Sequence, residues 1–129
     1  MTENLRTVFY DCHLRHGAKI TGFGGWDMPL QYTGILQEHL ATRKGAGLFD
    51  VSHMGRFYIR GEEAPPFLQH VLTNNAAALD VGLGQYTMIP NGSGGVIDDA
   101  YLYRFVEDEY LLVVNASNRE KDWAHLEAV

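Results

Sequence analysis

Three consecutive antiparallel strands are predicted by residues 85–115, which read QYTMIPNGSGGVIDDAYLYRFVEDEYLLVVN. Two turn signals, Asn91-Gly92 and Glu107-Asp108, divide this segment into apolar runs of strand length, and Asn-Gly is a strong hairpin signal. The middle run, residues 94–106, is apolar and rich in aromatic side chains on both of its alternating faces. We therefore expect the middle strand to be covered on both sides.

Two adjacent carboxylates, Asp98 and Asp99, interrupt this apolar run. A carboxylate that is removed from water without a partner costs free energy or takes up a proton, so the placement needs a reason. Strand alternation points the two side chains to opposite faces, which excludes a simple pair that shares one proton. Asp99 lies on the face of three aromatic residues, which suit a flat aromatic ligand beside a carboxylate: Tyr101, Tyr103 and Phe105. We therefore expect the chemistry at Asp99.

Each acid also has a structural interpretation. Asp98 is equally consistent with a cap of the preceding turn, in which its carboxylate accepts backbone N–H groups. Asp99 is also consistent with a hydrogen bond or an ion pair to an arginine elsewhere in the chain. A buried acid is a candidate for function as well as for structure.

The composition limits the classes of function. The chain has 129 residues, of which 46% are hydrophobic, as expected for one globular domain or part of one. Ten basic and sixteen acidic residues give a net charge of −6, and the absence of a basic cluster argues against nucleic-acid or membrane partners. The N-terminus lacks the features of a signal or transit peptide, so we expect a cytoplasmic protein.

Helical spacing predicts four helices around the strands. The first begins after Asn4 and ends at Gly17, and the others cover residues 35–43, residues 62–72 and a segment that Ser117 opens. Ser117 and Glu120 have the spacing of a capping box, with Trp123, Leu126 and Ala124 inward. Residues 18–32 are expected to be irregular or extended, and residues 56–60 to be extended.

This order of elements predicts an α+β fold with a mixed, largely antiparallel sheet. No linker or repeat divides the chain, so we expect residues 1–129 to form one domain without an internal boundary. The last helix has no C-cap signal before Val129, and the layers are incomplete. We therefore expect the chain to be part of a longer fold.

Other chemistry has weak support in the sequence. Cys12 has no second cysteine to pair with and lies on the apolar face of the first expected helix, which favours a buried thiol. His13 and His16 share a helix face, but no third ligand is near in sequence, so we expect no metal site. His39 is expected in the core or at an interface. Ser52 and His53 are adjacent and point apart, which does not make a nucleophile and its base.

Four motifs in this sequence resemble those of a known protein family. They are residues 23–32 (FGGWDMPLQY), residues 43–55 (RKGAGLFDVSHMG), residues 94–99 (GGVIDD) and residues 115–122 (NASNREKD). Their order resembles that of the aminomethyltransferase family, the T-proteins of the glycine cleavage system. Members of that family are longer and arrange several domains around a folate site, so this chain resembles their N-terminal portion.

The resemblance implies a reaction and its partners. Such enzymes take the aminomethyl group from the dihydrolipoyl arm of H-protein, release ammonia, and transfer the one-carbon unit to tetrahydrofolate. By motif position the resemblance assigns the catalytic role to Asp99. Tyr86 and Tyr103 match positions that contact folate, and Asn115 matches the start of a motif close to that site. Met54 matches a position that lines the channel to the site, and it is equally consistent with core filling. The resemblance implies no metal. Other site residues come from later segments in the family, so we expect this stretch alone to have little or no activity.

Two alternatives remain open at this stage. One is a related folate-dependent methyltransferase or demethylase, which would not depend on lipoyl-loaded H-protein. The other is a non-catalytic, folate-binding accessory protein, whose cysteine-containing signature would lie beyond Val129.

Overall fold

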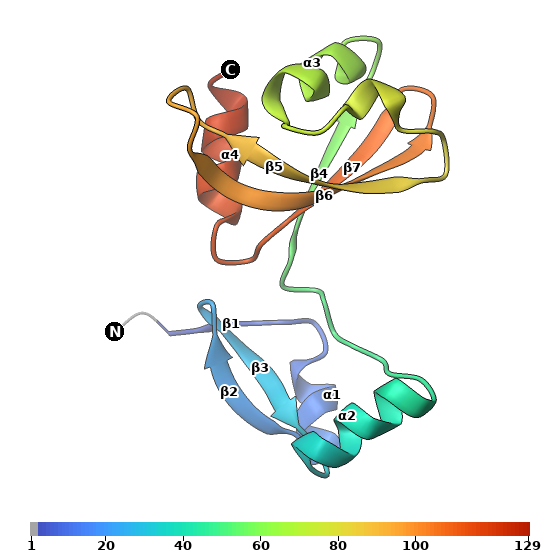
Figure 1. Cartoon of the computed structure of the whole chain (residues 1–129). Helices are drawn as coiled ribbons and strands as arrows, with labels where there is room; N and C mark the ends of the chain where they lie inside the picture. The colour runs from blue at the N-terminus through green and yellow to red at the C-terminus, as the bar shows by residue number, and fades with distance from the viewer. Residues whose placement is uncertain (1–2) are drawn as a thin grey trace. The chain divides into compact units, whose positions relative to one another are not determined.

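The computed structural model describes residues 3–129, which fall into two compact units (Figure 1). Unit 1 ends at His53 and unit 2 begins at Met54. No change of composition marks this division. The expectation of one domain over residues 1–129 stays a prediction. In the described residues no helix is long and apolar enough to cross a membrane.

Unit 1 contains a small mixed sheet and two helices. Its elements are β1 (Leu5–Arg6), α1 (Tyr10–Arg15), β2 (Lys19–Phe23), β3 (Trp26–Gln31) and α2 (Ile35–Lys44). The strand order is β1-β3-β2, with β1 parallel and β2 antiparallel to β3. Gly24 and Gly25 join β2 to β3 with φ angles of 55° and 82°, which glycine adopts without steric cost. The stretch that we expected to be irregular or extended is therefore a hairpin.

The expected first helix is wrong in its first half. Leu5 pairs with Trp26 in the sheet, and its N–H donates to the carbonyl of Gly25 at 2.9 Å. Helix α1 starts only at Tyr10, and Val8 is 86% exposed, so the apolar helical face does not form. Pairing with a distant strand has overridden the local spacing. Cys12 is half-buried instead of buried.

Helix α2 agrees closely with the expected helix over residues 35–43. The Glu38 carboxylate accepts hydrogen bonds from the backbone N–H groups of Tyr32, Thr33 and Gly34 at 2.8, 2.7 and 3.0 Å. These bonds satisfy the N–H groups that precede the helix and lower the pKa of Glu38. No residue of α2 is buried, so the expectation of a core position for His39 is wrong within the described chain.

Unit 2 is a four-stranded antiparallel sheet with helices on one face (Figure 1). Its elements are β4 (Gly55–Arg60), α3 (Ala64–Val71), the 3-10 helix η1 (Ala76–Ala78), β5 (Gly84–Pro90), β6 (Val96–Val106), β7 (Glu109–Val114) and α4 (Arg119–Glu127). The strand order is β4-β7-β6-β5. The three predicted consecutive strands, the α+β class and the largely antiparallel pairing are therefore confirmed.

The core of unit 2 lies between the sheet and its helices. The first turn of helix α3 contains Pro65 and Pro66, which it tolerates because the N–H groups of a first turn have no intrahelical partner. The buried side chains come from every element of the unit: Phe57, Ala64, Leu68, Val71, Leu72, Ala76, Leu79, Ile89, Ala100, Leu102, Tyr110, Leu112, Val114 and Leu126. This core face of β6 is the one that carries Asp98.

The opposite face of the sheet is not covered by any element of unit 2. It presents exposed aromatic and apolar side chains from β4, β5 and β6: Tyr58, Tyr86, Met88, Tyr101, Tyr103 and Phe105. Within unit 2 the expected cover is therefore present on one side of β6 only. An antiparallel sheet needs only one packed face, and apolar composition alone does not say what covers the other. We call this surface the open face.

Helix α4 differs from its predicted form. Asn118 occupies the N-cap position and makes no side-chain capping bond, so the capping box of Ser117 and Glu120 does not form. Leu126 is buried as expected, but Trp123 is 48% exposed, with its ring 5.3 Å from that of Phe57. The other buried residue on this helix is an acid, Asp122, and none of its surface is exposed.

Candidate functional site

Asp99 lies half-buried on the open face of β6 and accepts two hydrogen bonds. The Tyr86 hydroxyl, from β5, donates to Oδ2 at 2.8 Å, and the Asn115 amide donates to Oδ1 at 2.8 Å. The bond to Asp99 raises the pKa of Tyr86 and so keeps this hydroxyl as a donor. The structure therefore brings together three of the five residues predicted for the site.

Asp98 is buried on the core face of the same strand, with 7% of its surface exposed. The expectation that it caps the preceding turn is wrong, because the side chain of Asn91 does this by accepting from the N–H groups of Ser93 and Gly95. Burial alone would raise the pKa of Asp98. Hydrogen bonds, first among them that from Asn115, outweigh burial and lower the pKa.

The side chain of Asn115 joins the two acids. It follows the last residue of β7, Val114, which pairs with Ala100 of β6. Its Nδ2 lies 3.0 Å from Oδ1 of Asp98 and 2.8 Å from Oδ1 of Asp99, so its two amide hydrogens can serve one carboxylate each. The two acids point to opposite faces, as the alternation predicts, but they meet at one amide.

Two tyrosines extend the open face beside Asp99. The rings of Tyr101 and Tyr103 are 4.9 Å apart and tilted by 35°. A Cβ atom on Gly84 of β5 would lie 2.7 Å from the first ring and 2.8 Å from the second, so glycine lets the rings lie over this strand. Tyr103 is thus on the face of Asp99, and no hydrogen bond joins the two side chains in residues 3–129.

Met54 directly precedes β4, and the first residue of that strand, Gly55, pairs with Val114. The register therefore places Met54 at the end of the sheet where Asn115 lies. Its side chain is half-buried, and its predicted contact with folate stays a prediction.

Unit 1 contains a polar cluster that the sequence analysis missed. His13 Nε2 lies 2.9 Å from Oδ2 of Asp50, and His13 Nδ1 lies 2.7 Å from the hydroxyl of Tyr32. Both contacts are satisfied when Nε2 carries the ring hydrogen. Burial raises the pKa of Asp50, but hydrogen bonds from Ser52, Thr7 and His13 outweigh it, and the net pKa is lowered.

Both ring nitrogens of His13 are engaged within this cluster. His13 is 7% exposed and is already engaged by Asp50 and Tyr32. Across residues 3–129 no three His, Cys, Asp or Glu side chains are placed to hold a metal ion. The cluster borders a cavity of about 590 Å³, which Cys12 and Phe49 also line.

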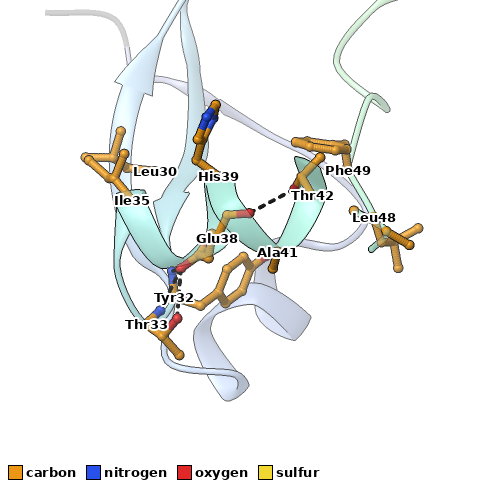
Figure 2. A pocket seen from close by; sticks show the side chains of 12 residues that line it. Leu30, Tyr32, Thr33, Ile35, Glu38, His39, Ala41, Thr42, Leu48 and Phe49 are labelled. Carbon is orange, nitrogen blue, oxygen red and sulfur yellow. Dashed lines mark hydrogen bonds between the residues drawn. The ribbon is translucent and has the colours of Figure 1, made fainter. Parts of the chain in front are cut away.

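A second cavity of about 570 Å³ lies over α2 in unit 1 (Figure 2). Figure 2 shows Glu38 directed towards Thr33 and the hydroxyl of Thr42 bonded to the helix backbone. The lining is mostly apolar and includes Leu30 and Phe49. None of the five predicted site residues lines this cavity.

Comparisons with known proteins agree with this architecture. The model of the GCVT N-terminal domain family matches residues 9–129. The chain belongs to the GCVT N-terminal domain family. The family assignment covers both units and includes all five predicted site residues.

Curated relatives of this family member are aminomethyltransferases. A protein from Thermus thermophilus is 57% identical over 124 residues, which is 96% of this chain and 36% of that protein. A protein from Desulfitobacterium hafniense is 48% identical over 128 residues, which is 99% of this chain and 35% of that protein. The chain thus spans about a third of the length of these relatives.

A solved structure shows the same fold. The crystal structure of glycine cleavage system aminomethyltransferase T from Bartonella henselae matches with a TM-score of 0.91 and 43% identity. The match covers 95% of this chain and 34% of the other. The structural likeness therefore extends over nearly all of the GCVT N-terminal domain described here.

Proposed function

We propose that this chain is the part of a tetrahydrofolate-dependent aminomethyltransferase that supplies its catalytic carboxylate, Asp99. The observation that carries the proposal is the position of Asp99. It is half-buried on an open aromatic face and is held by donors from two other segments, Tyr86 and Asn115. The names of the relatives support the same reaction class.

The chemistry explains why a fixed carboxylate is useful. The carbon of the aminomethyl group breaks its bonds to sulfur and to the departing ammonia, and it forms bonds to two folate nitrogens. Positive charge develops on this carbon and on its nitrogen neighbours. A carboxylate that already has its hydrogen bonds can stabilise that charge without reorganising. Because Asp99 is half-buried, its field is screened less than it would be in water.

The open face offers surface for the flat ring of a folate. Tyr101 and Tyr103 present ring surface next to Asp99, and Tyr86 presents its hydroxyl to the carboxylate. We expect Tyr86, Tyr103, Asn115 and Met54 to contact this substrate, and the lipoyl arm of H-protein to deliver the aminomethyl group. We also expect the reaction to occur in the cytoplasm, as a prediction from the sequence.

The test is the variant Asp99→Asn in the complete gene product. It keeps the shape and removes the charge, so transfer of the one-carbon unit to tetrahydrofolate should fall by about 100-fold or more. Asp108→Asn is the matched control, because Asp108 is exposed in the β6–β7 turn and uses only its backbone carbonyl to contact Gly61. Full activity of Asp99→Asn would contradict the proposal that Asp99 is the catalytic carboxylate.

The donor distinguishes this reaction from related ones. Transfer should require lipoyl-loaded H-protein, and free sarcosine or dimethylglycine should not replace it. Transfer from a methylamine without H-protein would show a related methyltransferase instead. Folate binding without any transfer would show an accessory protein.

A further inference from the structure

Asp122 is a buried acid that the proposed reaction does not use. It lies on α4, on the side that packs against the sheet, and none of its surface is exposed. Neither of its carboxyl oxygens accepts from an N–H or O–H group in residues 3–129, and the same holds for Oδ2 of Asp98. Buried polar atoms are rarely left without partners, so these three oxygens need an explanation.

The two carboxyl groups are each other's partners. Lys121 on α4 donates to the backbone carbonyl of Ile97 on β6 at 2.8 Å, which places the following residue of each element, Asp122 and Asp98, near one another beneath the sheet. Each of the two carboxyl groups also acts on the pKa of the other. Two ionised carboxylates cannot satisfy each other because neither has a hydrogen to give, but one protonated group can donate to the other. A single shared proton therefore accounts for the contact and provides a donor between the two acids.

The proton belongs mainly on Asp122. Burial raises the pKa of Asp122 to about 7, with a further rise from its contact with Asp98. The charges that act on it are those of Asp98 and Asp99 from β6 and that of Lys121 from α4, which opposes them. Asp98 has the Asn115 amide as a donor, and its pKa is lowered. Asp98 is thus the member of the pair that stays ionised.

A continuous series of contacts leads from this pair to the site. Asp98 accepts from Asn115, Asn115 also donates to Asp99, and Asp99 accepts from Tyr86. We propose that Asp122 is a positioning residue, which shares one proton with Asp98 so that the pair holds the Asn115 amide against Asp99. Asp122 itself acts only through these residues, and its effect on catalysis rests on the proposed function.

The pair makes the site sensitive to pH. Above about pH 7 the shared proton is lost, and two adjacent buried charges repel each other. Asp98 then moves or takes up water, and the Asn115 amide loses its fixed partner. In Asp122→Asn the amide donates to Asp98 at every pH, so this change should not occur. In Asp122→Leu the donor is absent at every pH.

The direct test is NMR of the complete gene product as a function of pH. The carboxyl carbon of Asp122 should titrate near the neutral range, and the side-chain amide signals of Asn115 should shift with the same midpoint. In Asp122→Asn the Asn115 signals should stay constant over that range. Titration of Asp122 in the ordinary range of aspartates would overturn the proposal. Asn115 side-chain amide shifts that stay constant while Asp122 titrates would also overturn it.

Activity provides the second readout. Asp122→Leu should lose about ten-fold in transfer, the size expected when a hydrogen bond to a charged group is removed, and Asp122→Asn should recover most of that loss. The activity of the wild type should fall as the pH rises above neutral, and this fall should be absent from the pH–activity profile of Asp122→Asn. Asp108→Asn should retain the wild-type profile. Equal loss in Asp122→Asn and Asp122→Leu, with both folded by circular dichroism, would contradict the positioning role.

The two proposals fail in different ways. If the wild type shows no folate-dependent transfer but the Asn115 amide signals shift with the midpoint of Asp122, the proposed function is wrong and the coupling stands. If transfer is normal but the Asn115 amide signals do not shift with the titration of Asp122, the coupling is wrong. The NMR comparison needs only wild type and Asp122→Asn, so it holds even where Asp122→Leu does not fold.

Discussion

At the scale of single residues, the hydroxyl of Tyr86 is the donor to Asp99 that is easiest to remove. Tyr86→Phe keeps the ring on the open face and deletes the 2.8 Å hydrogen bond to Oδ2. We expect about a ten-fold loss of folate-dependent transfer, because Asp99 keeps its bond to Asn115. Steady-state kinetics of the complete gene product would measure this.

Tyr58→Phe is the control for Tyr86→Phe. Tyr58 lies on β4 on the same open face and is 57% exposed, and the hydrogen bonds of the described residues do not involve its hydroxyl. Its removal should leave transfer unchanged. An equal effect of the two substitutions would show that Tyr86 acts through general surface polarity and not through Asp99.

The sequence predicted which faces Asp98 and Asp99 occupy, because alternation along a strand is a strict geometric rule. It did not predict that Asn115 joins them, because that contact depends on where β7 ends relative to β6. It also did not predict the burial of Asp122. One signal was present, since Asp122 precedes the buried Leu126 by one helical repeat, but a charged residue at such a position is normally assigned to the solvent side.

At the scale of elements, the β5–β6 hairpin depends on the side chain of Asn91. Its Oδ1 accepts from the N–H of Ser93, the hydroxyl of Ser93 and the N–H of Gly95. Asn91→Ala should therefore destabilise unit 2 by about 1–2 kcal/mol. Ser93→Ala should cost less, because two backbone N–H bonds to Asn91 remain. Urea unfolding of both variants would test this order, and a larger effect of Ser93→Ala would contradict it.

The start of β4 requires a residue without a side chain. A Cβ atom on Gly55 would lie 2.6 Å from Cγ2 of Val114 and 2.8 Å from Cγ of Arg119. Val114 is fully buried in the core of unit 2. Gly55→Ala should therefore destabilise unit 2 by about 1–3 kcal/mol, as overpacking does. Gly92→Ala is the control, since a Cβ atom there meets nothing within 4 Å, and a similar loss in both variants would refute the steric explanation.

The elements differ in how well the sequence predicts them. Strands β5, β6 and β7 were found because their apolar runs are separated by strong turn residues. The start of the chain was misassigned because Leu5, Val8, Phe9 and Cys12 have helical spacing, whereas Leu5 actually pairs with Trp26. Local spacing carries no information about a strand that follows about twenty residues later.

At the scale of the whole molecule, each unit has its own tryptophan, Trp26 in unit 1 and Trp123 in unit 2. In this 129-residue chain, the stability of each unit can therefore be measured separately by fluorescence, using Trp123→Phe for unit 1 and Trp26→Phe for unit 2. The two units should respond to pH in opposite directions above about pH 4, because the pKa of Asp50 in unit 1 is lowered and that of Asp122 in unit 2 is raised.

Unit 1 should lose stability in acid. The pKa of Asp50 is lowered in the folded chain, so its stabilisation is present above the ordinary aspartate pKa of about 3.9 and is lost as the pH falls through the folded value. Asp50→Asn should be less stable than the wild type at neutral pH and should lose less on acidification. Urea unfolding followed at Trp26 would measure both, and parallel pH curves would contradict the role of Asp50.

Unit 2 should lose stability as the pH rises from about 4 to about 7. The folded pKa of Asp122 is about 7, above its unfolded value, so the folded state binds the extra proton and is stabilised at lower pH. The slope is at most about 1.4 kcal/mol per pH unit. It should be absent from Asp122→Asn when unfolding is followed at Trp123. If the free energy of unfolding falls equally with pH in both proteins, the extra proton of the folded state is not on Asp122.

The relatives of this family member are about three times as long as the chain described here. The sequence motifs predicted the family because they occur in order along almost the entire chain. The sequence could not show that β6 has an open face, because its aromatic residues look the same whether a ligand or protein covers them. Only the packing of unit 2 distinguishes its two faces.

A β-sheet normally separates the chemistry of its two sides by the thickness of its backbone. In unit 2 the amide of Asn115 stands at the end of β7 and contacts an acid from each side of β6. Changes beneath the sheet, at Asp122 on α4, can therefore reach the face that carries Asp99 without any shift of the strands. Sequence variation in α4 among otherwise similar enzymes would then alter their pH range while their substrate-facing residues remain identical.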